Sequence, residues 1–105
     1  MGLFSRLRGK SIDDYIAEAD AQGIKVIDVR EPDEFDAGHI PGAFNVPLSS
    51  LRDVTKVEPD KTKPVYVHCM GGNRSGRACS QLKAMGYIKA VNIGGINSYH
   101  GPIER

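Results

Sequence analysis

The sequence predicts a single α/β domain in which a mainly parallel sheet of four or five strands carries helices on both faces. Short apolar runs rich in β-branched residues, at 24–29, 43–46, 65–69 and 90–93, alternate with segments whose apolar residues recur at helical spacing. The links between these segments are short, and such alternation is typical of parallel sheets covered on both sides. A chain of 105 residues with 40% hydrophobic content is enough for one modest core and not for two.

Residues 1–10 are expected to form an N-terminal tail ahead of a domain that spans residues 11–105. The tail mixes apolar and basic residues, but one short basic segment without a second anchor binds lipid weakly. Packing or fraying of the tail is therefore favoured over membrane contact. Ser11 and Asp14 then resemble a capping box that opens a helix, and Gly23 is placed to end it.

The next part of the chain supplies a buried strand, a turn and two short helices. Pro32 lies in the first turn of the first helix, where a missing N–H is tolerated. The turn carries His39, which could act as a general base but is favoured as a hydrogen-bonding partner of the loop backbone. The remaining elements are a strand at 43–46, a short helix at 48–54 and a polar surface loop at 57–63.

The stretch from residue 65 to residue 86 is the part around which the chain is organised. Its strand ends at Cys69, on the edge of the sheet where α/β proteins bind ligands. Gly71 and Gly72 allow the backbone to curl so that successive amides point inward. A helix is expected from Ser75 to a C-cap at Gly86, with four apolar residues at helical spacing, Ala78, Cys79, Leu82 and Met85.

Cys69 is predicted to be a reactive thiol. Inward amides and a helix amino terminus both present partial positive charge to a developing thiolate, and Arg74 adds a full charge. The alternative is that Cys69 is a small buried hydrophobe, as most cysteines in reducing compartments are. The flanking Gly-Gly-Asn-Arg-Ser is difficult to explain as core, and it favours the reactive thiol.

Three other side chains near this stretch are given structural rather than chemical interpretations. His68 points away from Cys69 because neighbours on a strand alternate, so it is expected to be packed or partly exposed and not a base. Cys79 shares the apolar helix face and is favoured as core over a resolving thiol. Gly94 and Gly95 are expected to form a tight turn close to the cysteine, as a wall of the site.

Three segments of the chain resemble the rhodanese-like sulfurtransferases. The segment CMGGNRS, residues 69–75, is similar to the active-site loop of that family. DVREPDEFDAGHIPGAFNVP, residues 28–47, resembles its amino-terminal motif, and GGINSYHGP, residues 94–102, resembles its closing segment. The resemblance covers about residues 11–103, and the three motifs occur in the family's order.

The resemblance implies a parallel α/β sheet and transfer of sulfane sulfur through a persulfide on Cys69. A donor such as thiosulfate would load the cysteine, and cyanide or a low-molecular-weight or protein thiol would remove the sulfur. No metal and no organic cofactor is required. Arg74 would act with the cysteine, and Asp28 and Arg30 would form a structural ion pair beneath the loop. The expected substrate-binding residues are Met70, Gly71, Gly72, Asn73 and Ser75.

Two residues depart from the family pattern. Many members that use thiosulfate carry a basic residue directly after the cysteine, where this chain has Met70. Loss of that charge is expected to weaken use of the thiosulfate dianion and to leave persulfide carriage intact. Tyr99 stands where many members have tryptophan, which is interpreted as a conservative packing change.

Two further classes of function stay open. Cysteine phosphatases and arsenate reductases also combine a cysteine, a cradle of amides and an arginine. Their loops, however, place one residue more between cysteine and arginine than the four found here, which leaves this loop too small for a tetrahedral oxyanion. The other alternative is a rhodanese-like module that carries or senses persulfide for a partner without turnover.

Composition excludes several other functions. A net charge of +1 argues against nucleic acid as the main partner, and no apolar stretch is long enough for a membrane span. Two cysteines make neither a disulfide framework nor a zinc site. Six basic residues and no acid lie between residues 61 and 103, which favours anionic substrates or is a solvated basic face. A cytoplasmic monomer is expected.

Overall fold

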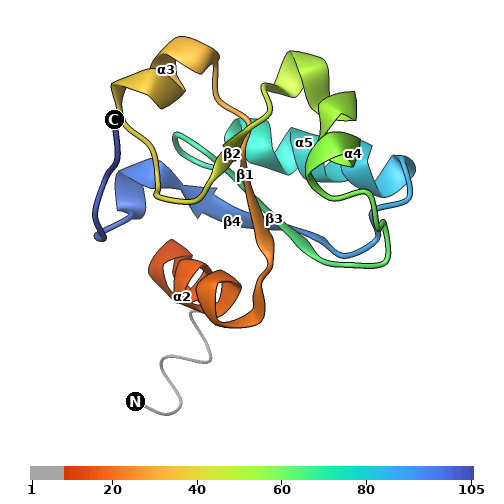
Figure 1. Ribbon diagram of the computed structural model, residues 1–105, viewed down its shortest axis with the longest axis horizontal. Helices are drawn as coiled ribbons and strands as arrows, with labels where there is room; N and C mark the ends of the chain where they lie inside the picture. Colours follow the sequence, from red (N-terminus) through yellow and green to blue (C-terminus); the bar gives the residue numbers. More distant parts are fainter. Residues whose placement is uncertain (1–8) are drawn as a thin grey trace.

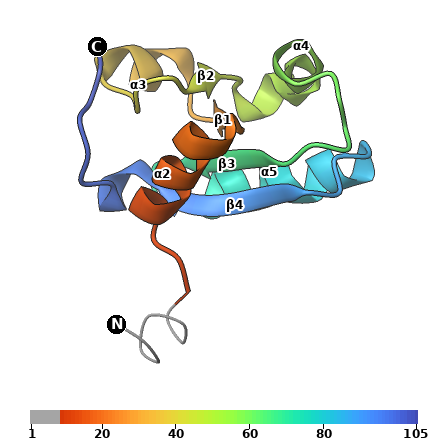
Figure 2. The ribbon, with the colours of Figure 1, turned by 60° about the horizontal axis from the view of Figure 1, so that its bottom comes forward.

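The computed structural model describes residues 9–105, which form one four-stranded sheet with all strands parallel. Figure 1 shows these strands with the helices around them, and the strand order β2-β1-β3-β4 can be followed in Figure 2. The strands are β1 (Lys25–Asp28), β2 (Phe44–Asn45), β3 (Val65–Cys69) and β4 (Ala90–Gly95). This confirms the predicted fold class. The predictions for the tail fall, apart from Gly9 and Lys10, outside the described residues.

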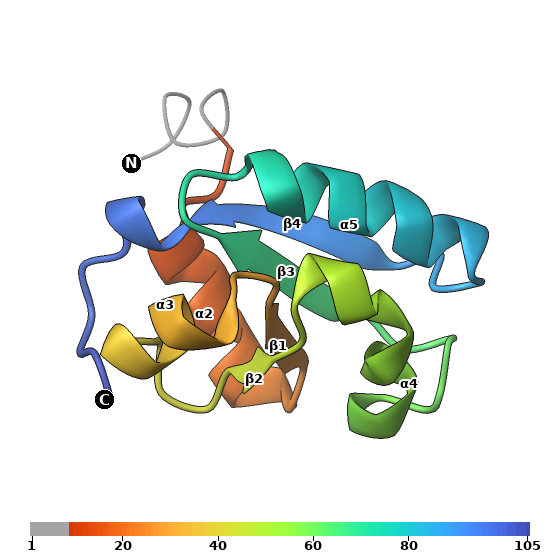
Figure 3. The same ribbon diagram turned by 90° about the horizontal axis from the view of Figure 1, so that it is seen from above.

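Helices pack on both faces of the sheet and at its carboxyl edge. They are α2 (Ile12–Gln22), α3 (Pro32–Ala37), α4 (Val54–Val57) and α5 (Asn73–Ala84), with the 3₁₀ helices η1 (Leu48–Asp53) and η2 (Ile96–Ser98). Helix α2 covers one face, whereas α5, η1 and α4 lie on the other, as Figures 2 and 3 show. No helix in the described part of the chain is long and apolar enough to cross a membrane.

The alternation of side chains along β3 divides the interior into two cores. Val65, Val67 and Cys69 face α5 and pack with Leu82 in the larger core. Tyr66 faces the opposite way, into the smaller core beneath α2. All five residues of β3 are buried, as a central strand of a doubly covered parallel sheet requires.

Local capping explains where α2 begins and ends. Ser11 accepts a hydrogen bond from the Asp14 amide at 3.2 Å, and the Asp14 carboxylate accepts one from the Ser11 amide at 3.1 Å. The predicted capping box is therefore present. Gly23 ends the helix with φ of 70°, a conformation that side chains disfavour.

Several boundaries differ from the sequence-based predictions, among them the C-cap of α5, which is Met85 and not Gly86. Helix α5 begins at Asn73, not Ser75, because Gly72 at its N-cap takes a φ of 107° and turns the chain at once into the helix. The helix expected at 48–54 is a 3₁₀ helix that continues into α4. Gly94 and Gly95 form no tight turn: they are the end of β4, whose register slips where His68 pairs with Gly94.

The carboxyl ends of the parallel strands bring three connections to one edge of the sheet. Helix α3 follows β1, the turn into α5 follows β3, and η2 follows β4 (Figure 3). The last residues of the chain then return to α3, where His39 and Glu104 exchange backbone hydrogen bonds of 2.9 and 2.8 Å. This edge is where the candidate site lies.

Candidate functional site

Cys69 is the last residue of β3, and its sulfur faces the loop that follows. The backbone N–H of Gly72 donates to Sγ at 3.0 Å, and the Ser75 Oγ lies 3.4 Å from it. The cysteine is only 1% exposed, so these groups and not bulk water surround its sulfur. We call residues 69–75 the cysteine loop. The backbone amides of Gly71, Gly72 and Ser75 point at this one atom, which is the arrangement that an anionic sulfur needs.

The surroundings of Cys69 act on its pKa in opposite directions. Burial raises the pKa, because a thiolate is poorly solvated in the interior. Hydrogen bonding from the Ser75 side chain and from the backbone amides of Ser75, Gly72 and Gly71 lowers it and outweighs the burial. The pKa of Cys69 therefore lies below its ordinary value, which increases the share of nucleophilic thiolate near neutral pH.

Close contact with β4 holds the cysteine loop in shape. A Cβ on Gly95 would lie 2.2 Å from the Met70 carbonyl oxygen and 2.5 Å from the Cα of Gly71. Only a glycine permits this approach. The backbone N–H of Asn97 in η2 donates to the same Met70 carbonyl at 3.1 Å. The predicted closeness of Gly95 to the loop is present, although it comes from a strand and not from a turn.

Asn92 in β4 is a site neighbour that the sequence did not reveal. Its side-chain N–H donates to the Gly72 carbonyl at 3.0 Å, and its oxygen accepts from the Ser75 hydroxyl at 2.8 Å. Ser75 is fully buried and lies between Asn92 and Cys69. Asn92 therefore contacts both ends of the turn that cradles the sulfur.

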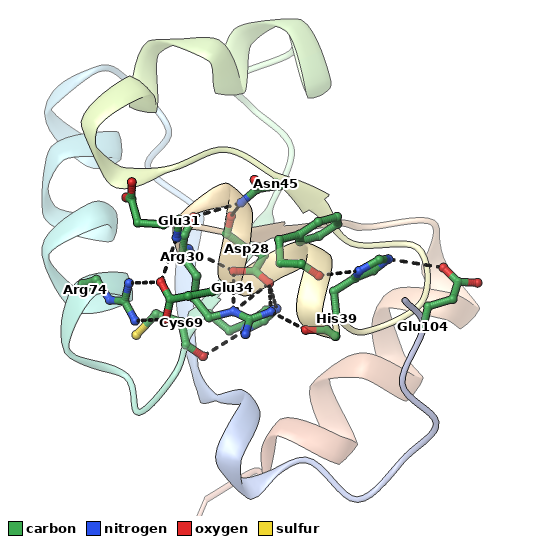
Figure 4. Close-up of polar contacts among 12 residues, drawn as sticks. Asp28, Arg30, Glu31, Glu34, His39, Asn45, Cys69, Arg74 and Glu104 are labelled. Carbon is green, nitrogen blue, oxygen red and sulfur yellow. Dashed lines mark hydrogen bonds and ion pairs between the residues drawn. The ribbon is translucent and has the colours of Figure 1, made fainter.

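Arg74 forms a two-pronged ion pair with Glu34 of α3. Its two terminal nitrogens lie 2.7 and 3.1 Å from the two carboxylate oxygens, as Figure 4 shows. The hydrogen bond from Arg74 lowers the pKa of Glu34 to about 2, and Glu34 in turn raises the pKa of Arg74. The charge that was expected to act on the sulfur is thus shared with a carboxylate.

A second ion pair is buried where β1 ends. The Arg30 guanidinium donates to both oxygens of Asp28, with the shortest contact at 2.8 Å, and also to the Gly38 carbonyl at 2.8 Å. Asp28 is fully buried and Arg30 is 3% exposed. The ion pair expected from the resemblance is present, and it fixes the chain that leads from β1 into α3.

His68 is fully buried beside this pair, deeper than the sequence suggested. Its Nδ1 lies 3.2 Å from the Cys69 carbonyl oxygen, and its Nε2 lies 3.8 Å from Asp28. Among residues 9–105, Nε2 is the one buried side-chain nitrogen or oxygen without a hydrogen-bond partner. Burial, which penalises the charged ring, lowers the pKa of His68.

The remaining candidate residues of the sequence lie partly on the surface of the cysteine loop and partly outside it. Met70 is 43% exposed on the rim of the cysteine loop, and Gly71 is exposed beside it. Asn73 is the exposed first residue of α5. His39 directs Nδ1 to the Phe35 carbonyl at 2.9 Å, which confirms the backbone contact favoured over a general base. Cys79 is buried in the larger core, and burial raises its pKa to about 11.

Two residues of the site, Glu34 and Asn92, were not predicted from the sequence, and they differ in the local signal that each gives. Glu34 lies in an acidic first turn of α3, where a carboxylate is already explained by the helix dipole. Its contact with Arg74 spans 40 positions and depends on the fold alone. Asn92 is a residue of β4 near the carboxyl edge of the sheet, and a polar side chain at that edge is the only local signal it gives.

The geometry supports nucleophilic chemistry at one sulfur atom. The thiol has a lowered pKa, inward N–H donors and a buried hydroxyl neighbour, and the amino terminus of α5 lies next to it. Such a cradle stabilises negative charge on the cysteine sulfur or on an atom bonded to it. A covalent adduct on Cys69 is the simplest use of this arrangement.

Comparison with known proteins shows which family and which proteins this sequence is similar to. The family described as "Rhodanese-like domain" matches residues 11–101. Uncharacterized protein YqhL of Bacillus subtilis is 46% identical over 81 residues, which are 76% of this chain and 64% of YqhL. Thiosulfate sulfurtransferase PspE of Escherichia coli is 38% identical over 72% of this chain and 74% of PspE.

A solved structure agrees with these relatives. The crystal structure of a rhodanese-related protein from Thermoplasma volcanium has a TM-score of 0.75 and 33% sequence identity. The match covers 91% of this chain and 96% of that one. The fold and the sequence pattern therefore point to the same family.

Proposed function

Because this chain belongs to the rhodanese-like domain family, we propose that it is an enzyme that moves sulfane sulfur through a persulfide on Cys69. The thiolate of Cys69 attacks the outer sulfur of a donor, and the bond between that sulfur and the rest of the donor breaks. The leaving group departs with the bonding electrons. A nucleophilic acceptor then takes the outer sulfur and restores the thiolate.

The observation that carries this proposal is the set of donors around one sulfur. The Gly72 N–H and the Ser75 hydroxyl approach Sγ, and hydrogen bonds from the loop outweigh the effect of burial on the thiol pKa. The same donors can stabilise the terminal sulfur of a persulfide, which carries the negative charge after loading. A buried structural cysteine requires none of these contacts, as Cys79 illustrates.

We propose thiosulfate, or another small anionic sulfane donor, as the source of sulfur. Cyanide, a low-molecular-weight thiol or a protein thiol serves as acceptor. Support comes from the relative named a thiosulfate sulfurtransferase and from another named a putative sulfur carrier protein. Arg74 is proposed to guide the anion, and Met70, Gly71, Gly72, Asn73 and Ser75 to surround it. No metal or organic cofactor takes part in this scheme.

A steady-state panel of donors and acceptors tests the proposal. Parent protein is expected to transfer sulfur from at least one donor, and Cys69→Ser is expected to lose that transfer. Cys79→Ser is the matched control, because it changes the same atoms at a cysteine outside the loop. Transfer that persists in Cys69→Ser, or that is absent with every sulfane donor, rejects the proposal.

A persulfide carrier without turnover is the second candidate, and the charges at the loop favour it. Met70 supplies no cation at the rim, and the Arg74 guanidinium is already bound by Glu34. A dianion therefore meets less net positive charge than the loop sequence alone implies. A large gain in thiosulfate turnover in Met70→Arg would favour the enzyme over the carrier, because it would show that charge alone was missing. No gain would favour the carrier.

The family and the loop length together disfavour a cysteine phosphatase or arsenate reductase. Aryl phosphate hydrolysis that disappears in Cys69→Ser would reverse this conclusion. We further propose a cytoplasmic monomer that needs no nucleic acid and makes no stable membrane contact. Two unpaired cysteines suit a reducing compartment. Size-exclusion chromatography with light scattering tests the monomer.

A further inference from the structure

Asn92 makes three hydrogen bonds at the end of β4, and together they fix the orientation of its amide. The nitrogen donates to the Gly72 carbonyl at 3.0 Å, while the oxygen accepts from the Gly94 N–H at 3.0 Å and from the Ser75 hydroxyl at 2.8 Å. Turning the amide over would set donor against donor and oxygen against oxygen. The amide atom that faces the Ser75 hydroxyl is therefore the oxygen, which can only accept a hydrogen bond.

Asn92 and Cys69 consequently compete for the one hydrogen of the Ser75 hydroxyl, which has a third and more distant acceptor in the Gly94 carbonyl oxygen at 3.5 Å. The Ser75 Oγ lies 2.8 Å from the Asn92 oxygen and 3.4 Å from the Cys69 sulfur. While the hydrogen points to Asn92, Ser75 offers the sulfur only a lone pair. A lone pair suits the S–H of a neutral thiol. A thiolate, in contrast, needs the hydroxyl hydrogen turned toward it.

We propose that Asn92 is a positioning residue that holds the Ser75 hydroxyl while Cys69 is a neutral thiol and releases it when the sulfur ionises. In the thiol form, S–H donates to the Ser75 oxygen and the hydroxyl donates to Asn92. On ionisation, the thiol proton leaves to solvent and the hydroxyl turns about its Cβ–Oγ bond. The hydrogen bond from the hydroxyl to Asn92 is exchanged for one to the thiolate. The hydrogen bond from S–H to the Ser75 oxygen is lost with the proton, and no bond between heavy atoms changes.

The exchange leaves the Asn92 oxygen with a donor, although Asn92 itself is an exposed residue. The Gly94 N–H stays on the Asn92 oxygen when the Ser75 hydroxyl leaves it. The Asn92 nitrogen meanwhile keeps its bond to the Gly72 carbonyl, so the loop that presents the Gly72 N–H to sulfur is not disturbed. Ser75 can therefore change partner at little cost, which a single isolated acceptor would not allow.

The use of this device rests on the proposed sulfur transfer. When Cys69 takes up a sulfane sulfur, the negative charge moves to the outer atom and Sγ becomes neutral. The Ser75 hydroxyl then returns to Asn92, or follows the charge to the outer sulfur if that atom lies within reach. In either case the hydroxyl is held in place and ready when the thiolate is restored.

A double-mutant cycle on the thiol pKa tests the competition. The pKa of Cys69 is measured from the pH dependence of iodoacetamide alkylation, mapped to the cysteine by mass spectrometry. The four proteins are the parent, Asn92→Ala, Ser75→Ala and the double variant. Asn92→Ala is expected to lower the pKa of Cys69 by about one unit more when Ser75 is present than when residue 75 is alanine. The reason is that a hydroxyl freed from Asn92 donates more fully to the thiolate.

Two results would overturn the proposal. Equal shifts in both backgrounds would show that Asn92 only braces Gly72. An upward shift confined to the Ser75 background would show that Asn92 aims the hydroxyl at the sulfur instead of competing for it. Asn92→Asp keeps an acceptor, loses the donor to Gly72 and adds a negative charge that acts whether or not Ser75 is present. Measured with and without Ser75→Ala, it is expected to show no Ser75-dependent lowering. Such a lowering in Asn92→Asp would equally contradict the proposal.

The readout is independent of sulfur transfer. Alkylation titrates the thiol without any sulfur donor or acceptor, so the cycle gives an answer even if the proposed enzymatic activity fails. Unfolding midpoints of all four proteins are measured alongside. Only the sign and the Ser75 dependence of the pKa shift support the proposal, and loss of stability alone would move neither.

Discussion

Arg74 and Glu34 join the cysteine loop to α3 through two hydrogen bonds, of 2.7 and 3.1 Å, between side chains 40 positions apart. Both side chains are 29% exposed, so solvent screens the pair only in part. The contact has two consequences. It fixes the position of α3 at the mouth of the site, and it takes up much of the positive charge that the loop brings to the sulfur.

Glu34→Gln is expected to lower the free energy of unfolding at neutral pH by about 1 kcal/mol, because a partly exposed ion pair is lost. The pH dependence is more specific. The pKa of Glu34 lies at about 2 in the folded protein against an ordinary value of 4.5, so its contribution is complete above pH 4.5 and is lost as the pH falls toward 2.

Urea unfolding between pH 6 and pH 3 measures this contribution. The parent should lose stability more steeply than Glu34→Gln over the acidic half of the range. Asp33→Asn removes an exposed carboxylate from the same helix and is the matched control. Parallel curves for the parent and Glu34→Gln would show that the pair contributes nothing to folding.

The buried ring of His68 leads us to expect a second decrease in the free energy of unfolding, at a higher pH than that caused by Glu34. Burial lowers the pKa of its ring in the folded protein below the ordinary value of 6.5. Below pH 6.5 the unfolded chain therefore binds a proton that the folded protein does not, and the free energy of unfolding falls until the folded pKa is reached. His68→Asn keeps a side-chain donor near the Nδ1 position and does not titrate.

Chemical denaturation between pH 7.5 and pH 5 compares the two proteins. The parent should show the steeper decline, and His68→Asn the flatter one. Identical slopes would mean that the buried ring is protonated as readily as in the unfolded chain. The unpaired Nε2 beside Asp28 would then have to carry a proton and a charge, which contradicts a lowered pKa for this ring.

Gly95→Ala is expected to impair the site by displacing the cysteine loop. Its new Cβ would meet two backbone atoms, the Met70 oxygen at 2.2 Å and the Gly71 Cα at 2.5 Å, and neither can move without the loop. We expect the rate of persulfide formation to fall by about tenfold or more, because the backbone N–H groups of the displaced loop no longer point at the Cys69 sulfur. The free energy of unfolding should fall by about 1 to 3 kcal/mol.

Gly71→Ala is the comparison for this experiment. The nearest atom to its Cβ is the side-chain nitrogen of Asn97 at 3.9 Å, which is an ordinary contact. It should keep most of the stability and most of the loading rate. Equal losses in Gly71→Ala and Gly95→Ala would show that any added methyl group disturbs the loop and that the approach of β4 has no special part.

Cys79→Ala is expected to leave sulfur loading unchanged. Burial raises the pKa of this thiol to about 11, and the side chain packs in the core with Leu82. Its loss should cost about 1 kcal/mol of unfolding free energy through the space it leaves. Peptide mapping after loading should find the added sulfur on Cys69 alone. A disulfide between Cys69 and Cys79 during turnover would instead identify Cys79 as a resolving thiol.

The sequence allowed prediction of those parts of the fold that depend on local signals. The short β-branched and aromatic run around Val67 favours a buried strand. Gly23 and Ser11 mark the ends of α2 through their own backbone and side-chain chemistry. Cys69 is predictable for the same reason, because the glycines and the polar residues of its loop are adjacent in the sequence.

The contacts that could not be predicted join distant segments. Glu34 meets Arg74 only because β1 and β3 are neighbours in a parallel sheet and end at the same edge. Asn92 reaches Ser75 from β4, whose register with β3 slips just after Asn92, and no local pattern encodes either feature.

The central claim is that the cysteine loop holds one charged, nucleophilic sulfur that accepts and then gives up a sulfane sulfur. The most direct measurement is the intact mass of the protein after successive addition of a sulfane donor and an acceptor, with peptide mapping of both cysteines. We predict a gain of one sulfur atom on Cys69 with the donor and its loss with the acceptor. A protein whose Cys69 gains no sulfur from thiosulfate, polysulfide or a low-molecular-weight persulfide would contradict this claim.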